Sequence, residues 1–263
     1  MSRFGDATTI KQVDEGRFEV ELDGDFGMAE AVNGGYLMAV LGRAAVASSP
    51  HEHPVATATT FLRAAAPGRA EITVDTLKAG RTAATARVSL AQGGRTATEA
   101  LITTGTLDAS AEPTYTGERP APWLPPIEEC TEFVPPEGLT GFAAQMDLRY
   151  DPATMRWLEG RPTGVPELRA WFRLRDPHGN DAAALALAVD ALPPVALNAG
   201  ARGWSPTVEL TWHMRAIPAP GWLALHGSGR LVTGGWFDEE VEVWDSAGRL
   251  VAQSRQIARL GRG

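Results

Sequence analysis

The sequence lacks the features that would mark a secreted or membrane-spanning chain. Among 263 residues there is a single cysteine, Cys130, which excludes an internal disulfide and favours a reducing compartment. The longest apolar runs are rich in alanine and glycine and too short to span a bilayer. The amino-terminus, Met1–Asp6, has no charged-then-apolar pattern of a signal peptide. We therefore expect a cytoplasmic protein with no membrane partner.

The sequence also lacks an excess of basic residues. The formal net charge is −8 and no basic patch is visible, which argues against a nucleic-acid partner. The acidity also disfavours polyanions, so a phosphate-bearing ligand would need local Arg or Lys contacts. Metal-ligand spacing is confined to His51-Glu52-His53, and alternate loop residues rarely converge with a third ligand. No metal site is predicted.

The amino-terminal part contains a predicted strand, a helix and four further strands. Residues 13–23 alternate apolar and acidic side chains, which is typical of a strand with one solvated face. Asn33 is suited to cap a helix that begins with Gly34-Gly35. These glycines leave backbone N–H groups open to a carbonyl oxygen or an anion, or they only permit close packing. Further strands are predicted at 55–63, 70–79, 81–92 and 96–104, with a Gly93-Gly94 turn between the last two.

Prolines and glutamates crowd the next part of the chain, from Leu107 to about Ala144. This composition is typical of a linker laid along a surface. The predicted organisation is therefore an amino-terminal half at 1–106, a linker at 107–144 and a carboxyl-terminal half at 145–263.

The second half contains an alanine-rich helix with one carboxylate. The helix is predicted from Asp181 to about Leu192, and it carries Asp190 shortly before Pro193-Pro194. Burying a charge costs several kcal/mol unless the charge is paired, so Asp190 is either a solvated helix-end acid or a functional group. Strands are predicted around it at 145–150, 167–175, 207–215, 222–231, 235–245 and 250–260.

Two short segments recur between the halves at a nearly constant offset. Phe61-Leu62-Arg63-Ala64 matches His213-Met214-Arg215-Ala216, and each is followed by a Pro-Gly pair. Gly94-Arg95 matches Gly248-Arg249. One meander with one helix buries a single face of a sheet, so two such halves are expected to join their sheets edge to edge.

The order and spacing of these segments resemble the acyl-CoA thioesterase II family over nearly the whole chain. The resemblance implies an α+β fold, a double hotdog in which two tandem halves form one continuous antiparallel sheet around two central helices. The chain departs from the family at Ala56–Thr60 and Val208–His213, which bears on substrate preference. The segments that carry the resemblance are Asn33–Tyr36, Phe61–Arg63, Gly80-Arg81, Arg169–Arg173, Asp190 with Leu192–Leu197, Pro206–Val208, and Gly248–Gln253 leading to Gln256.

The resemblance also implies an activity, the cofactor-free hydrolysis of a fatty or other acyl-CoA to free acid and CoA. Three polar side chains of the family hold the attacking water, and their positions match Asp190, Thr207 and Gln256. Asp190 would act as general base, and Thr207 and Gln256 would orient the water. The expected place of Asp190 in the last helical turn, among apolar neighbours, would raise its pKa.

The first-half helix has no carboxylate from Tyr36 to Ser49, which predicts an asymmetric enzyme whose base comes from the second half. Substrate contacts are expected from Asn33, Gly34 and Gly35 if the helix start joins the active site. Candidates for the CoA phosphates are Arg63, Lys78 and Arg81, although solvated charges at strand ends are the simpler interpretation of all three.

Two other functions fit parts of the pattern. A hotdog enoyl-CoA hydratase or dehydratase would use an Asp/His pair, and no Asp-x4-His pattern follows either helix start. A non-catalytic acyl-CoA-binding protein would bind the ligand without turnover. Family resemblance also suggests a homodimer.

Overall fold

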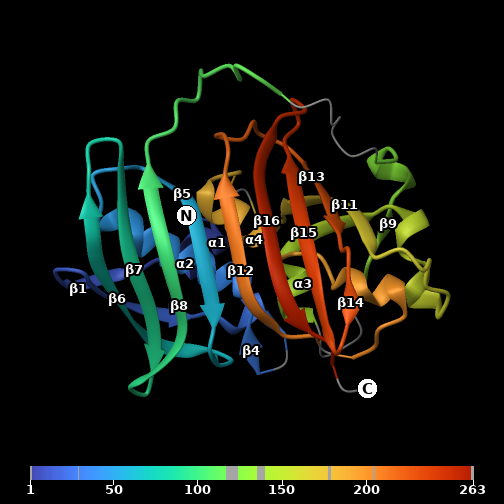
Figure 1. Cartoon of the computed structure of the whole chain (residues 1–263), viewed down its shortest axis with the longest axis horizontal. Coiled ribbons are helices and arrows are strands. Elements are labelled where there is room, and N and C mark those ends of the chain that lie inside the picture. The colour runs from blue at the N-terminus through green and yellow to red at the C-terminus, as the bar shows by residue number, and fades with distance from the viewer. Residues whose placement is uncertain are drawn as a thin grey trace.

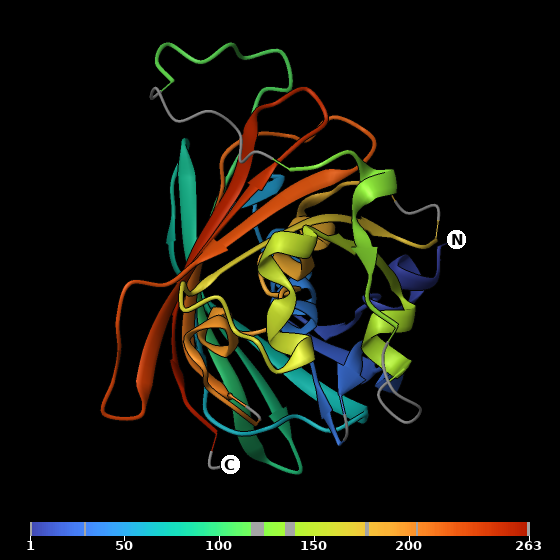
Figure 2. The same ribbon diagram turned by 90° about the vertical axis from the view of Figure 1, so that its right-hand side faces the viewer.

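The computed structural model describes residues 2–28, 30–116, 124–134, 140–176, 179–203 and 205–261. Within these residues, one 14-stranded sheet has exclusively antiparallel pairings and curves around the main helices (Figures 1 and 2). The expectation of a single antiparallel sheet around central helices is confirmed. None of the described helices is both long and apolar enough to cross a membrane.

The first half follows the predicted order with one correction. Residues 13–23 are not one strand, because β1 (Lys11–Asp14) and β2 (Arg17–Leu22) form a hairpin. Gly16, in the turn between them, has a φ of +63°, a conformation that glycine adopts without strain. The other elements of this half are α1 (Arg3–Ala7), the 3-10 turn η1 (Gly24–Phe26), β3 (Gly27–Met28), β4 (Ala31–Val32), α2 (Gly34–Ala47), β5 (His53–Phe61), β6 (Gly68–Ala79), β7 (Ala83–Gln92) and β8 (Arg95–Gly105).

The second half repeats the arrangement of a central helix and a meander. Its helix, α4 (Ala182–Ala188), is capped by the Asp181 side chain, begins one residue later than predicted and ends well before Leu192. The other elements are β10 (Met146–Tyr150), η3 (Pro152–Thr154), η4 (Arg156–Glu159), β11 (Glu167–Leu174), η5 (Val195–Ala199), β12 (Thr207–Met214), β13 (Leu223–Ser228), β14 (Val232–Thr233), β15 (Trp236–Trp244) and β16 (Leu250–Arg259).

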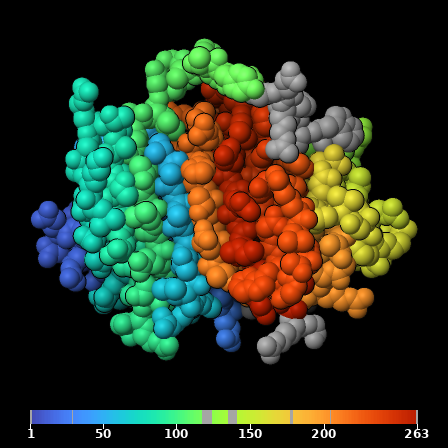
Figure 3. Space-filling view, viewed as in Figure 1, coloured from blue at the N-terminus to red at the C-terminus, as the bar shows by residue number. Residues whose placement is uncertain are grey.

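The two halves meet where β5 pairs with β12. The order across the sheet is β1-β2-β6-β7-β8-β5-β12-β16-β15-β13-β11-β10-β9, with β14 paired to β15. The space-filling view shows strands of both halves side by side on the outer face, with the light blue of β5 next to the orange of β12 (Figure 3). The sheet is therefore continuous across the junction of the halves.

Backbone contacts also recur between the halves, shifted by one residue from the predicted match of Arg63 with Arg215. The N–H groups of Leu62 and Arg63 both donate to Ala97 O, and those of Arg215 and Ala216 both donate to Val251 O. The recurring turn glycines also match, with φ values of +73° at Gly94 and +74° at Gly248. The backbone just beyond the carboxyl end of β5 and that beyond β12 are thus held by the same kind of hydrogen bonds.

Helices α2 and α4 pack against each other on the inner face of the sheet. α2 buries residues on all sides, from Tyr36 and Leu37 to Ala45. α4 is built from alanine and leucine and buries Ala183 through Ala188. Small side chains allow the two helix backbones to approach closely where α2 and α4 meet.

The described residues of the segment 107–144 contact both halves. β9 (Thr131–Glu132) pairs with β10, while α3 (Thr140–Ala144) contacts η1 and β3 of the first half. The 3-10 turn η2 (Ile127–Glu129) precedes β9, and Trp171 Nε1 donates to Pro125 O at 2.9 Å. The chain after β8 arches over one end of the sheet (Figures 1 and 3).

Candidate active site

Asp190 lies just beyond the end of α4. Val189 is the last, capping residue of the helix, and the Asp190 N–H donates to Leu187 O at 3.2 Å. Pro193-Pro194 then prevents the chain from continuing as a helix. Asp190 is therefore not in the last helical turn, as the sequence had suggested, but in the bend that follows it.

The carboxylate of Asp190 contacts the amino-terminus of α2 from the other half. Oδ2 accepts hydrogen bonds from the Gly35 N–H at 2.8 Å and from Asn33 Nδ2 at 3.1 Å. Asn33 also caps its own helix, because its Oδ1 accepts from the Tyr36 N–H at 3.0 Å. The predicted cap is confirmed, and it additionally binds the acid.

The two glycines at the start of α2 are needed for close approach. A Cβ atom at Gly35 would lie 2.8 Å from Ala186 O and 3.0 Å from Leu187 Cα, both backbone atoms of α4. A Cβ atom at Gly34 would lie 2.9 Å from Asp190 Oδ2. Both interpretations of the glycines therefore apply, since they permit close packing and also offer an N–H group to an anion.

The electrostatic environment of Asp190 differs from the one expected. Burial raises the pKa of Asp190 to about 6, while hydrogen bonds from Gly35 and Asn33 act in the opposite direction. The sequence suggested that the carboxyl end of its own helix would also raise the pKa. Instead the side chain faces the positive end of α2, which favours the carboxylate. Desolvation alone accounts for the rise.

Thr207 and Gln256 lie next to each other on the inner face of the sheet. Thr207 Oγ1 is 2.6 Å from Gln256 Oε1, and the hydroxyl donates. Thr207 begins β12 at a register irregularity, and Gln256 is on the neighbouring β16. The hydrogen bonds of Asp190 go to α2 rather than to these two residues.

A buried carboxyl group, Glu239, was missed by the sequence analysis. It is 2% exposed and lies opposite Gln256 on β15. Its Oε1 accepts from Gln256 Nε2 at 3.0 Å, and its Oε2 accepts from the Val195 N–H at 2.8 Å. Burial raises the pKa of Glu239 to about 8, and the charge of Asp190 adds to the rise. The signal was present, because Glu239 shares the inward-facing alternation of Phe237 and Val241.

Two hydrogen bonds connect the segment around Asp190 to β16 and β15, the strands that carry Gln256 and Glu239. Ser254 Oγ of β16 donates to Val189 O at 3.3 Å, and the Val195 N–H donates to Glu239. These contacts lie on either side of Asp190 in sequence. The structure thus joins the helix start of the first half with the polar strand residues of the second.

The candidate CoA contacts do not gather in one place. Arg63 is exposed and donates to Thr96 O beyond the end of β5. Lys78 and Arg81 are exposed at the β6–β7 hairpin, at the opposite end of the sheet from the start of β12 (Figure 1). His51 Nε2 at this end lies 3.0 Å from Gly80 O. Lys78 and Arg81 are therefore separated from Asp190 by the length of α2.

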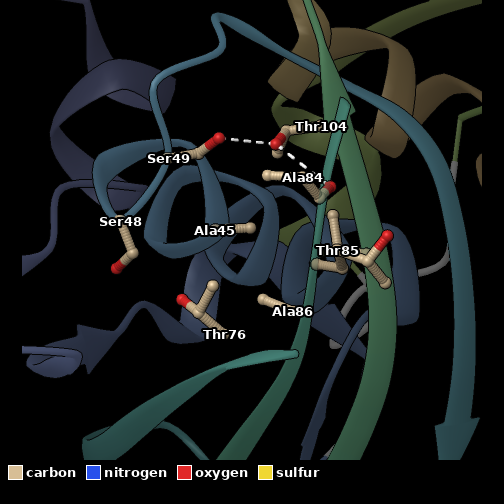
Figure 4. Close-up of a pocket in the computed structure, with 9 residues that line it drawn as sticks. Ala45, Ser48, Ser49, Thr76, Ala84, Thr85, Ala86 and Thr104 are labelled. Atoms are coloured by element: carbon tan, nitrogen blue, oxygen red, sulfur yellow. Dashed lines mark hydrogen bonds between the residues drawn. The ribbon is translucent and has the colours of Figure 1, made fainter. Parts of the chain in front are cut away.

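A small cavity occurs at the carboxyl end of α2, the counterpart in the first half of the position of Asp190 (Figure 4). Ser49 and Thr104 are hydrogen-bonded to each other across it at 2.6 Å. Its described lining is made of hydroxyl and apolar side chains without an ionisable group: Ala45, Ser48, Ser49, Thr76, Ala84, Thr85, Ala86, Ile102 and Thr104. Of the two corresponding positions, after α2 and after α4, only the one after α4 carries an acid, Asp190.

Fold and site together define a double-hotdog protein, and solved structures agree. A Thermobifida fusca YX protein whose thioesterase II assignment is provisional is 45% identical, with a TM-score of 0.93 over 100% of this chain and 98% of that one. A protein of unknown function with a hot dog fold from Alicyclobacillus acidocaldarius has a TM-score of 0.83 at 22% identity, covering 99% and 98%. The latter shows the fold alone.

Family models match both halves. The acyl-CoA thioesterase N-terminal domain matches residues 22–105, and the acyl-CoA thioesterase C-terminal domain matches residues 124–260. The uncharacterized protein Rv0499 of Mycobacterium tuberculosis is 33% identical over 92% of this chain and 90% of its own length. The chain belongs to the acyl-CoA thioesterase family. A dehydratase domain from the CurJ module of curacin polyketide synthase, 13% identical with a TM-score of 0.54 over 96% and 95%, shares only the fold.

Proposed function

We propose that this protein hydrolyses the thioester of an acyl-CoA, with Asp190 as general base and Thr207 and Gln256 holding the attacking water. The observation that carries the proposal is the environment of Asp190. Burial raises its pKa to about 6, which suits a base that must be ionised yet basic near neutral pH.

In the proposed reaction, the water oxygen attacks the thioester carbonyl carbon while Asp190 accepts a proton. The carbonyl oxygen gains negative charge, the C–S bond then breaks, and the CoA thiolate receives the proton. Gly35 already donates to Asp190, so its N–H is not free for the carbonyl. The Gly34 N–H, in the first helical position, has no intrahelical acceptor and is the proposed donor to the developing oxyanion.

The discriminating experiment is a panel of acyl-CoAs of different chain length, assayed for release of free thiol. Turnover that is lost in Asp190→Asn would support the proposal. Binding of acyl-CoA without turnover would instead favour the non-catalytic alternative. Interconversion of enoyl-CoA and hydroxyacyl-CoA without thiol release would favour the hydratase.

The assembly and the division of the chain are also proposals. We propose a homodimer, to be tested by light scattering during size-exclusion chromatography, where a monomer mass would contradict it. The proposed halves at 1–106 and 145–263, with 107–144 between them, draw support from the separate match of a family model to each half, and the second match begins at residue 124 within the proposed linker. Limited proteolysis should cut first between the halves.

A further inference from the structure

Glu239 occupies a position that links two parts of the proposed site. One carboxyl oxygen accepts from Gln256 Nε2 and the other accepts from the Val195 N–H. Val195 begins η5, five residues after Asp190 and directly after the proline pair. A single side chain therefore contacts both a proposed water-holding residue and the segment that carries the proposed base.

The carboxyl group of Glu239 also determines how the amide of Gln256 is oriented. The NH2 group of Gln256 faces Glu239 and its Oε1 faces Thr207, and ionised Glu239 enforces this orientation because a carboxylate only accepts hydrogen bonds. The Thr207 hydroxyl is then obliged to donate to Oε1. The second hydrogen of the amide and the lone pairs of Thr207 remain available for a water.

A buried carboxyl group such as that of Glu239 is energetically unfavourable if its role is purely structural. It is 2% exposed and forms no ion pair with another described residue, and burying an unpaired carboxyl group is unfavourable. Glutamine has the same shape but offers one acceptor and one donor group, so it cannot accept from both Gln256 and Val195. Both carboxyl oxygens of Glu239 act as acceptors in the observed arrangement.

We propose that Glu239 is a positioning residue, which fixes the Gln256 amide and holds the Val195 end of the Asp190 segment. The proposal extends the thioesterase function proposed above and rests on it for its effect on turnover. The orientation of Gln256 is a separate consequence, which can be measured whether or not the protein is a thioesterase.

The kinetic test compares Glu239→Gln with Glu240→Gln. Glu240 is the next residue on β15, and its side chain lies near Arg230 and Arg255 on the outer side of the sheet. We expect E239Q to lower kcat on the order of tenfold with KM within about twofold, and E240Q to leave both unchanged. In a Gln256→Ala background the further loss from E239Q should shrink to less than about twofold, because the residue acts through Gln256. Equal losses in both backgrounds would overturn the proposal.

A spectroscopic test uses protein labelled with 15N in its five glutamines, with Gln256 assigned from the signal lost in Gln256→Ala. In the native protein, one side-chain amide proton of Gln256 should exchange with solvent more slowly than those of the exposed Gln12. The Gln256 pair should shift in E239Q and stay in place in E240Q. Fast exchange of both native Gln256 protons would overturn the proposal, and this measurement does not require the E239Q variant to fold. Absence of thioesterase turnover in the wild-type protein would contradict the proposed function. The exchange measurement would then still decide whether Glu239 orients Gln256.

Discussion

The backbone N–H of Gly35 donates a hydrogen bond of 2.8 Å to the Asp190 carboxylate, which joins the helix start of one half to the acid of the other. An anion at a helix amino-terminus is stabilised by unpaired N–H groups and by the helix dipole. Desolvation opposes this and prevails, since the pKa of Asp190 is raised to about 6. The acid is thus held in place without losing its basicity.

Replacement of Asp190 by Asn should abolish most of the proposed activity. The amide retains an oxygen that can accept from Gly35, yet it cannot accept a proton from water. We expect kcat to fall by about 10²- to 10⁴-fold with little change in KM. The matched control is Asp181→Asn, which keeps an N-cap on α4. Full activity in D190N would exclude Asp190 as the base.

The proposed activity should depend on pH through Asp190. The base works when ionised, so kcat/KM should rise as the pH increases through about 6. The residual activity of D190N should not show this rise. A stopped assay at constant ionic strength between pH 5 and 8 measures the profile. A rate that is independent of pH over that range would contradict the assignment.

Two glycine substitutions in α2 should have opposite effects on stability. Gly35→Ala places a Cβ atom 2.8 Å from Ala186 O, so α2 and α4 must move apart. We expect a loss of about 1–3 kcal/mol in the free energy of unfolding, and reduced activity. Gly42→Ala meets nothing closer than 3.7 Å and should gain roughly 0.5–1 kcal/mol. Urea denaturation of both variants measures the difference, and equal effects would show that the helix contact tolerates a methyl group.

The hydroxyl of Thr207, rather than its shape, should matter for turnover. Thr207→Val removes the donor to Gln256 Oε1 and should lower kcat by about tenfold or more. Thr207→Ser keeps the hydroxyl and should retain most of the activity. Steady-state kinetics of the pair test this, and comparable activity in Val and Ser variants would remove Thr207 from the mechanism.

The pH dependence of stability should report Glu239. Its pKa is raised from 4.5 in the unfolded chain to about 8 in the folded protein, so the folded state binds more protons between these values. The free energy of unfolding should therefore decrease as the pH rises from 5 to 8. Glu239→Gln should flatten this decrease, and Glu240→Gln should leave it unchanged. Urea denaturation at several pH values provides the slopes, and identical slopes in native protein and E239Q would contradict the raised pKa.

The sequence predicted those features that depend on local chemistry. The cap at Asn33, the Gly93-Gly94 turn and most strands follow from side-chain type and alternation, and the repeat indicated how the halves join. Prediction from the sequence failed where contacts between distant parts of the chain determine the local structure. The environment of Asp190 depends on α2, which lies more than 140 residues earlier in the chain. Alternation with Phe237 and Val241 marked Glu239 as inward-facing, but nothing local identified Gln256 and Val195 as its partners.

The pairing of β5 with β12 makes the two halves dependent on each other in two ways. Separated, each would present an edge strand of nine or eight residues with unpaired backbone groups, which invites association with other chains. Each would also retain only one member of the contact between Gly35 and Asp190. The proposed activity and the protection of the sheet edges against aggregation therefore depend on the same pairing of β5 with β12.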